Sequence, residues 1–179
     1  MQYCIANELK DFRDFIFIRH GHTPWNPTDI SKGFLDLKLD ETGQYQATQA
    51  YTIVKEHLID CPIIYSSHLQ RAHETANIFA NKFIQTPQII LKEDLQERYY
   101  GDSKITPLKN SKLNAESNEI FQQRVCDVLR EIFEQTPKNI KNIIIVSHQK
   151  VFEFLTEWLS GNKLRLNNGG VCHFKFVSK

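Results

Sequence analysis

The stretch Phe15-Ile16-Phe17-Ile18-Arg19-His20-Gly21-His22-Thr23 decides how the rest of this chain is to be interpreted. Four apolar residues of high β-propensity lead directly into an arginine and a histidine. A run that is apolar on both faces is typical of a buried strand in an α/β sheet. Open α/β sheets bind their ligands beyond the carboxyl ends of their strands. The stretch therefore predicts a strand over residues 15–19 that delivers Arg19 and His20 to an anion-binding site.

Two further segments end in a similar way. The most apolar run of the chain, Ile143–Val146, continues into Ser147-His148, and the run at 62–65 ends in Ser66-Ser67, shortly before Arg71. If these runs are central parallel strands, their polar ends emerge at the same sheet edge, where the positive N-terminus of the following helix also favours an anion. The sequence therefore predicts one pocket built from Arg19, His20, Arg71 and His148.

Size and composition set the class of protein. The chain has 179 residues, and we expect a single domain over residues 1–179 in which residues 1–13 are a polar lead-in. The 22 basic and 21 acidic side chains give a formal net charge of +1, which argues against nucleic-acid binding by bulk charge. Apolar runs are too short for a membrane span or a signal peptide. The four cysteines form no closely spaced pair, so we expect reduced thiols in a cytoplasmic protein.

Apolar runs alternate with segments of helical periodicity along the chain. This alternation predicts an α/β fold, a three-layer α/β/α sandwich around a mostly parallel sheet. Asp40 and Ser67 are expected to cap helices, Gly161 to end one, and the long loop at 21–40 to carry function. The expected strands are 15–19, 62–65, 89–91, 142–147 and 171–177, the last at a sheet edge, and the expected helices are 41–58, 69–82, 117–134 and 150–159.

The side chains of the predicted pocket suit phosphate chemistry. An arginine offers a planar fork of donors that matches pairs of phosphoryl oxygens, and a neutral imidazole can attack phosphorus. Cationic walls then stabilise the charge of the transferred group. The departing alcohol needs a proton, which a carboxyl group of raised pKa can supply. The candidates are Glu93, Asp94, Glu97 and Asp102.

Several motifs follow one another in a fixed order. Arg19-His20-Gly21-His22-Thr23-Pro24-Trp25-Asn26 comes first, followed by Gly33-Phe34-Leu35-Asp36 and Tyr65-Ser66-Ser67-His68-Leu69-Gln70-Arg71-Ala72-His73-Glu74-Thr75-Ala76. Leu95-Gln96-Glu97-Arg98-Tyr99-Tyr100-Gly101 and Val146-Ser147-His148-Gln149 come later. In these motifs the chain resembles the histidine phosphatase superfamily, also called the phosphoglycerate mutase-like family, over residues 15–177.

The resemblance implies a phosphatase that hydrolyses a small phosphate ester through a phosphohistidine, without a cofactor or a metal ion. His20 corresponds to the family's nucleophile, and Glu97 corresponds to the acid and base. The residues that match the family's phosphate ligands are Arg19, Arg71, His148 and Asn26. The residues expected beside the rest of the substrate are Arg98, Tyr100, Gly33 and Gln149.

Three departures from the family pattern bear on function. His22 stands where an acidic residue is usual, and Gln149 stands where glycine is usual. The linker at 101–116 lacks the long insertion with which mutases hold a second anionic group, so a phosphatase is favoured over a mutase. A mutase, a protein phosphohistidine phosphatase and a catalytically dead phosphate-binding domain are the alternatives. A metal pair at His20 and His22 is disfavoured for lack of partner carboxylates.

The sequence leaves the substrate and the oligomeric state open. We expect a monomer or a homodimer, and an exposed edge strand at 171–177 would offer a surface for pairing between subunits.

Overall fold

The computed structural model describes residues 1–7, 12–24, 36–100 and 115–177. These residues form a six-stranded sheet in the order β1-β6-β2-β5-β3-β4. Four neighbouring strands, β2, β5, β3 and β4, are parallel, whereas β6 runs antiparallel to β2 and parallel to β1. The mostly parallel sheet predicted from the sequence is confirmed. The strands are β1 (Gln2–Asn7), β2 (Phe15–Arg19), β3 (Ile63–Ser67), β4 (Ile89–Lys92), β5 (Ile143–Ser147) and β6 (Val171–Val177).

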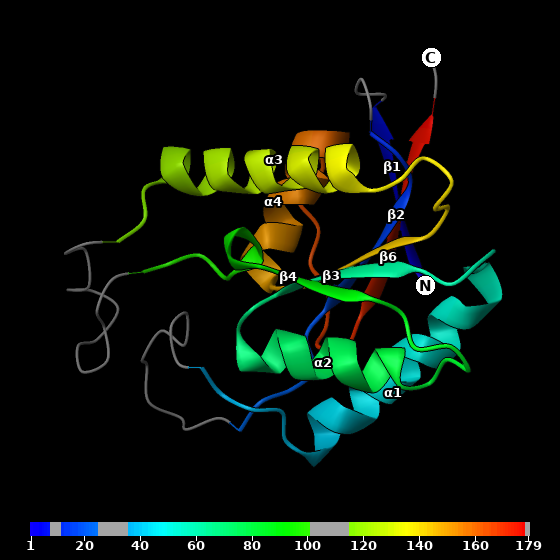
Figure 1. Ribbon diagram of the computed structural model, residues 1–179. Coiled ribbons are helices and arrows are strands. Elements are labelled where there is room, and N and C mark those ends of the chain that lie inside the picture. The colour runs from blue at the N-terminus through cyan, green and yellow to red at the C-terminus, as the bar shows by residue number, and fades with distance from the viewer. Residues whose placement is uncertain (8–11, 25–35, 101–114, 178–179) are drawn as a thin grey trace.

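Helices cover both faces of the sheet, with α1 and α2 on one side and α3 and α4 on the other (Figure 1). Two caps follow the prediction: the Asp40 side chain accepts a hydrogen bond from the Gly43 N–H, and Gly161 ends α4 with φ 75°. The predicted helix at 41–58 is shorter, because a 3₁₀ turn replaces its last residues. The helical elements are α1 (Glu41–Val54), η1 (Lys55–His57), α2 (Gln70–Ala80), η2 (Glu93–Leu95), α3 (Asn118–Gln135) and α4 (Gln149–Ser160).

The central strands are apolar on both faces because each face packs against a different pair of helices. On β2, Phe15 and Phe17 join the core beneath α3 and α4, whereas Ile16 and Ile18 join the core beneath α1 and α2. Successive side chains of a strand point to opposite faces, so a continuous apolar run fills both layers. The three-layer arrangement therefore follows from the same pattern that predicted β2.

Two expectations at the chain ends are wrong. The segment 171–177 is not an edge strand, because β6 lies between β1 and β2. Residues 2–7, expected in a polar lead-in, form β1, and every residue of β1 pairs with β6, from Gln2 opposite Cys172 to Asn7 opposite Val177. A strand without a neighbour leaves its backbone N–H and C=O groups open to pairing, and β1 satisfies those of β6. The route to a homodimer through an exposed 171–177 strand is thereby removed.

Candidate active site

The carboxyl ends of β2, β5 and β3 lie side by side and bring the predicted pocket together. Arg19 pairs with Ser147 across β2 and β5, so that His20 and His148 leave adjacent strands at the same level. Arg71 lies in the first turn of α2, directly after β3. All three strands run in parallel, which is why their ends coincide at one edge.

The His20 imidazole is held in one tautomer. It is buried, and its Nδ1 lies 2.7 Å from the carbonyl oxygen of Gly21. Because a carbonyl only accepts hydrogen bonds, Nδ1 carries the proton and Nε2 keeps its lone pair. Arg71 Nε donates to that Nε2 across 3.3 Å. The nitrogen that a nucleophile needs therefore faces a guanidinium.

His148 is fully buried beside His20, with 5.0 Å between the two ring centroids. Its Nε2 lies 2.9 Å from the Ser67 hydroxyl oxygen. That oxygen also accepts the Leu69 N–H at 3.3 Å, and the hydroxyl can give its own proton to His148 Nε2. In this arrangement Nδ1 carries the imidazole proton, and among the described residues Nδ1 has no hydrogen-bond partner. Burial lowers the pKa of His148 well below its ordinary value, and the charge of Arg71 acts in the same direction, so the ring is neutral.

Ser67 therefore serves His148 rather than capping α2 as predicted. The N-cap residue of α2 is Leu69, which offers no side-chain cap. The Ser67 hydroxyl oxygen accepts the Leu69 N–H, and the hydroxyl proton orients the His148 imidazole. A single hydroxyl group can both accept and donate a hydrogen bond.

The two arginines are largely removed from solvent. Arg71 is 5% exposed, and burial lowers its pKa while the charge of Glu97 opposes that change. Arg19 Nη1 donates to the Leu166 carbonyl across 2.7 Å. Arg19 Nε is buried and finds no hydrogen-bond partner among the described residues. A guanidinium stays charged even so, because its ordinary pKa lies far above neutrality. The pair thus concentrates positive charge next to His20.

Glu97 closes the pocket from the segment after η2. Its carboxylate accepts the N–H of Arg98 at 2.9 Å and that of Lys150, in the first turn of α4, at 3.1 Å. Burial raises the pKa of Glu97, and the hydrogen bond from Arg98 and the positive charge of Arg71 reduce this rise without cancelling it. A carboxyl group of raised pKa next to cations is suited to donate and accept a proton.

The remaining predicted substrate contacts have different surroundings. Arg98 lies over the rings of Tyr100 and Phe121, 5.5 and 5.6 Å from their centroids. Burial raises the pKa of Tyr100, so its hydroxyl keeps its proton. The amide group of Gln149 makes hydrogen bonds within the protein, to Glu153 and Leu166. Asn26 and Gly33 lie outside the described residues.

His22 does not form part of the buried cluster, because its ring turns toward α1. Its Nδ1 lies 2.5 Å from Asp40 Oδ2, and 44% of its side chain is exposed. The backbone here is tightly packed: a Cβ added to Gly43 would lie 2.1 Å from the His22 carbonyl oxygen. The described residues contain no group of three or more His, Cys, Asp or Glu side chains arranged for a metal ion.

Sequence reasoning missed the residues that fix the backbone around His20. Thr75 Oγ1 accepts the Gly21 N–H at 3.0 Å and donates to the Arg71 carbonyl at 2.7 Å. Asn168 donates to the His20 carbonyl at 3.1 Å, and the Gly169 N–H reaches the carbonyls of Arg19 and His20. Thr75 is a fixed member of the Arg71 motif and was therefore detectable. Asn168 has no signal in a single sequence.

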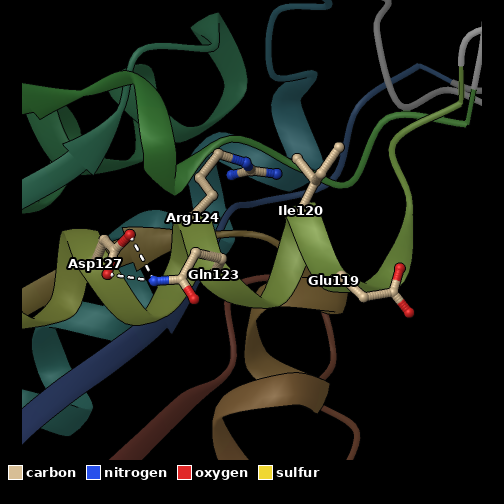
Figure 2. Close-up of a pocket in the computed structure, with 5 residues that line it drawn as sticks. All are labelled: Glu119, Ile120, Gln123, Arg124 and Asp127. Atoms are coloured by element: carbon tan, nitrogen blue, oxygen red, sulfur yellow. Dashed lines mark hydrogen bonds between the residues drawn. The ribbon is translucent and has the colours of Figure 1, made fainter.

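A second hollow lies on the outer surface of α3, away from these residues. Figure 2 shows its lining, where Ile120 is 62% exposed and Gln123 is hydrogen-bonded to Asp127. It holds no histidine and no pair of arginines, so it lacks the groups that define the His20 site. Its lining residues are Glu119, Ile120, Gln123, Arg124 and Asp127.

Known proteins are similar to this chain in sequence. A family model described as the histidine phosphatase superfamily (branch 1) matches residues 15–107. The chain is 32% identical over 175 residues to PhoE, an uncharacterised phosphatase of Bacillus subtilis, and the match covers 90% of this chain and 88% of that protein. It is 35% identical over 124 residues to phosphoglycerate mutase-like protein 4 of Arabidopsis thaliana, about half of whose length it spans (53%).

The fold also recurs among solved structures. The α-ribazole phosphatase from Shigella flexneri superposes with a TM-score of 0.74 at 22% identity, and the match covers 89% of each chain. This match shows that the two proteins share a fold. The chain belongs to the histidine phosphatase superfamily, and its relatives are phosphatases and phosphoglycerate mutases.

Two expectations about cellular context can be compared with the structure. Of the four free cysteines, Cys4 and Cys172 are buried and Cys61 is exposed. In the part of the chain that the structure describes, no helix has the length and apolar character needed to cross a bilayer.

Proposed function

We propose that this protein is a phosphatase that hydrolyses a small phosphate ester through a phosphohistidine on His20. The observation that carries the proposal is the state of the His20 ring. Gly21 fixes the proton on Nδ1, so the ring's lone pair is on Nε2, where it accepts the Arg71 Nε–H until a phosphoryl oxygen takes that donor. An activated neutral imidazole beside a cation is what in-line attack on a dianionic phosphate requires.

Binding comes first. Arg19 Nε and His148 Nδ1 are buried polar atoms without hydrogen-bond partners among the described residues. A buried donor without an acceptor is costly, and phosphoryl oxygens would satisfy both groups. Arg71 adds a third set of donors on the His20 side. The ester therefore binds with its phosphorus in front of His20 Nε2.

The transfer step forms an N–P bond and breaks the P–O bond to the alcohol. The His20 lone pair attacks phosphorus from the side opposite the leaving oxygen. The leaving oxygen takes a proton from the carboxyl group of Glu97, whose pKa burial raises above its ordinary value. Arg19 and Arg71 stabilise the charge on the three oxygens of the transferred group.

Hydrolysis reverses these roles. Glu97, now a carboxylate, accepts a proton from water, and the resulting hydroxide attacks the phosphohistidine. The N–P bond breaks, inorganic phosphate leaves, and the proton stays on Glu97 for the next cycle. One carboxyl group thus serves both half-reactions, and no cofactor enters the balance.

One relative that matches 90% of this chain supports a phosphatase over a mutase. The match to the Bacillus subtilis phosphatase covers 88% of that protein, whereas the match to the Arabidopsis thaliana mutase-like protein covers 53%. Mutases keep the phosphoryl group for return to a second hydroxyl. Release of inorganic phosphate without formation of an isomeric ester distinguishes the two activities.

The experiment is a substrate screen with inorganic phosphate as the readout. We expect turnover of p-nitrophenyl phosphate in the presence of EDTA, and its loss in His20→Ala. Sugar phosphates, phosphoglycerates, nucleotides, α-ribazole phosphate and phosphohistidine peptides then rank the substrate classes. Phosphate binding without turnover of any ester would instead support a catalytically dead domain, and wild-type-like turnover by His20→Ala would exclude the mechanism.

A further inference from the structure

The Gln149 side chain joins the start of α4 to the segment that follows this helix. Its Nε2 donates to Glu153 Oε1 across 3.1 Å, one helical turn further on. Its Oε1 accepts the backbone N–H of Leu166 across 3.3 Å. The Gln149 amide therefore bridges a side chain and a backbone group that are far apart in sequence.

The orientation of this amide is fixed by chemistry. Glu153 is 3% exposed, and its carboxylate accepts hydrogen bonds but donates none. Only the NH₂ end of Gln149 can face it, so the carbonyl end must face Leu166. Burial alone would raise the pKa of Glu153, but the hydrogen bonds from Lys150 and Gln149, together with the positive charges of Lys150 and Arg165, keep it below its ordinary value. Glu153 therefore stays ionised and remains an acceptor.

Leu166 passes this constraint to the phosphate site. Its carbonyl accepts Arg19 Nη1 across 2.7 Å, which is among the shortest contacts of the pocket. The following residues hold the same strand end: the Arg19 N–H donates to the Gly170 carbonyl at 3.0 Å, and the Gly169 N–H reaches the Arg19 carbonyl at 3.1 Å. A continuous series of hydrogen bonds thus runs from Glu153 through Gln149 and Leu166 to the Arg19 guanidinium.

We propose that Gln149 is a positioning residue that sets the guanidinium of Arg19 for phosphate, by holding Leu166 in place. The inference rests on the proposed function, because Arg19 matters to activity only if the site binds a phosphoryl group. It also explains the glutamine where the family pattern has glycine: a glycine has no side chain to reach Leu166. The phosphate affinity of this chain then depends on a contact that a glycine at this position does not make.

A double-mutant cycle tests whether Gln149 acts through Arg19. KM and kcat for p-nitrophenyl phosphate, and the inhibition constant of inorganic phosphate, are measured for the wild type, Gln149→Ala, Arg19→Ala and the double variant. We expect Gln149→Ala to raise KM and the phosphate inhibition constant about tenfold with kcat changed less than about threefold, because a uniformly used binding contact is weakened. In the Arg19→Ala background the same change should have less than about a twofold effect, because contacting residues are not additive.

The chain offers a matched control on α3. Gln123 Nε2 donates to the Asp127 carboxylate at 2.8 and 2.9 Å with the same four-residue spacing (Figure 2). Gln123→Ala removes an exposed pair of the same spacing on another helix and should leave KM unchanged. A KM increase in Gln123→Ala equal to that in Gln149→Ala would show a general loss of helix stability and overturn the inference.

A charge exchange keeps the test informative if Gln149→Ala folds poorly. Gln149→Glu sets a second carboxylate against Glu153 and should raise KM. Adding Glu153→Gln should lower KM again relative to Gln149→Glu alone, because an amide then again faces a carboxylate while an oxygen still accepts the Leu166 N–H. The double variant does not regain full wild-type KM, because Glu153→Gln also removes the ion pairs with Lys150 and Arg165. An unchanged KM would overturn the inference.

The outcomes separate this inference from the proposed function. Turnover by the wild type together with equal effects of Gln149→Ala in both backgrounds overturns the role of Gln149 and leaves the phosphatase standing. A wild-type protein that neither turns over p-nitrophenyl phosphate nor binds inorganic phosphate overturns both.

Discussion

Replacing Thr75 by valine removes the hydroxyl that joins the His20 turn to α2 while nearly conserving the volume of the side chain. Thr75 is fully buried, and its Oγ1 accepts the Gly21 N–H at 3.0 Å. In the variant this buried N–H loses its acceptor, which costs about 1–3 kcal/mol. The hydrogen bond from Oγ1 to the Arg71 carbonyl is also lost, but a carbonyl oxygen has a second lone pair, so we count only the cost of the unpaired Gly21 N–H.

We therefore expect Thr75→Val to lower the free energy of unfolding by about 2 kcal/mol. For a chain of this size that corresponds to a decrease in Tm of about 4–8 °C. Urea unfolding followed by circular dichroism measures the first quantity, and calorimetry measures the second. The kcat/KM for p-nitrophenyl phosphate should also fall, because Gly21 carries the carbonyl that fixes the His20 tautomer.

Thr48→Val is the matched control. Thr48, on α1, makes the same bond to the carbonyl four residues earlier, at 3.2 Å, and this bond is exposed to solvent. Its replacement should change the free energy of unfolding by less than about 0.5 kcal/mol. If Thr75→Val unfolds at the same urea concentration as Thr48→Val, the link between Thr75 and Gly21 contributes nothing and the reasoning is refuted.

Three further predictions concern single residues of the site and its surroundings. Glu97→Gln should reduce kcat for phenyl phosphate by about 10²–10⁴. The raised pKa of Glu97 makes folding of the wild type less favourable as pH rises from the pKa of the unfolded state to that of the folded state. The variant should therefore be at least as stable as wild type in urea unfolding at pH 8, and a less stable variant contradicts the direction of this pKa shift. Because the pKa of His148 is lowered in the folded state, the unfolded chain binds a proton there that the folded chain does not, so the free energy of unfolding should fall as pH drops below about 6.5. His148→Asn should show a smaller fall between pH 7.5 and 5.5. Equal dependence of unfolding free energy on pH in both proteins would exclude a lowered pKa of His148. Asp40→Ala removes the N-cap of α1 and the contact with His22, and it should lower the free energy of urea unfolding by about 1 kcal/mol with KM unchanged. A large increase in KM would show that His22 acts on the phosphate site.

The part of the site that lies on strands was predictable from sequence. The end of a strand is visible in a short stretch of sequence, and neighbouring parallel strands end at the same edge of the sheet. Arg19, His20 and His148 each follow an apolar run, and the sheet brings those runs together. Arg71 follows from the same logic one helix turn later. The tautomer of His20 was not predictable, since it depends on where the Gly21 carbonyl points.

The errors have physical causes as well. The pattern of residues 171–177 alternates as an edge strand would, but alternation only says that the two faces differ, not that a neighbour is missing. Residues 2–7 are too short and too mixed in character to be recognised alone, and the strand forms because β6 supplies a partner. The prediction for Ser67 was wrong for a similar reason. A serine before a helix usually caps that helix, but here the imidazole of His148 lies within hydrogen-bond distance of its hydroxyl.

His22 and Gln149 were both recognised as departures, and the structure gives them different neighbours. The His22 ring lies against Asp40 at the start of α1. The Gln149 amide lies in the series of bonds that ends at Arg19. One sequence shows that a residue is unusual, but only the packing shows which neighbour it serves.

The central claim is that His20 Nε2 becomes covalently phosphorylated during turnover. Rapid quenching of the wild-type enzyme with p-nitrophenyl phosphate, followed by digestion and mass spectrometry under alkaline conditions, detects an alkali-stable, acid-labile phosphate on the peptide that contains His20. We predict that this phosphopeptide forms within one turnover, disappears as substrate is exhausted, and is absent from His20→Ala. Sustained turnover with no phosphate on His20 at any quench time would contradict the account.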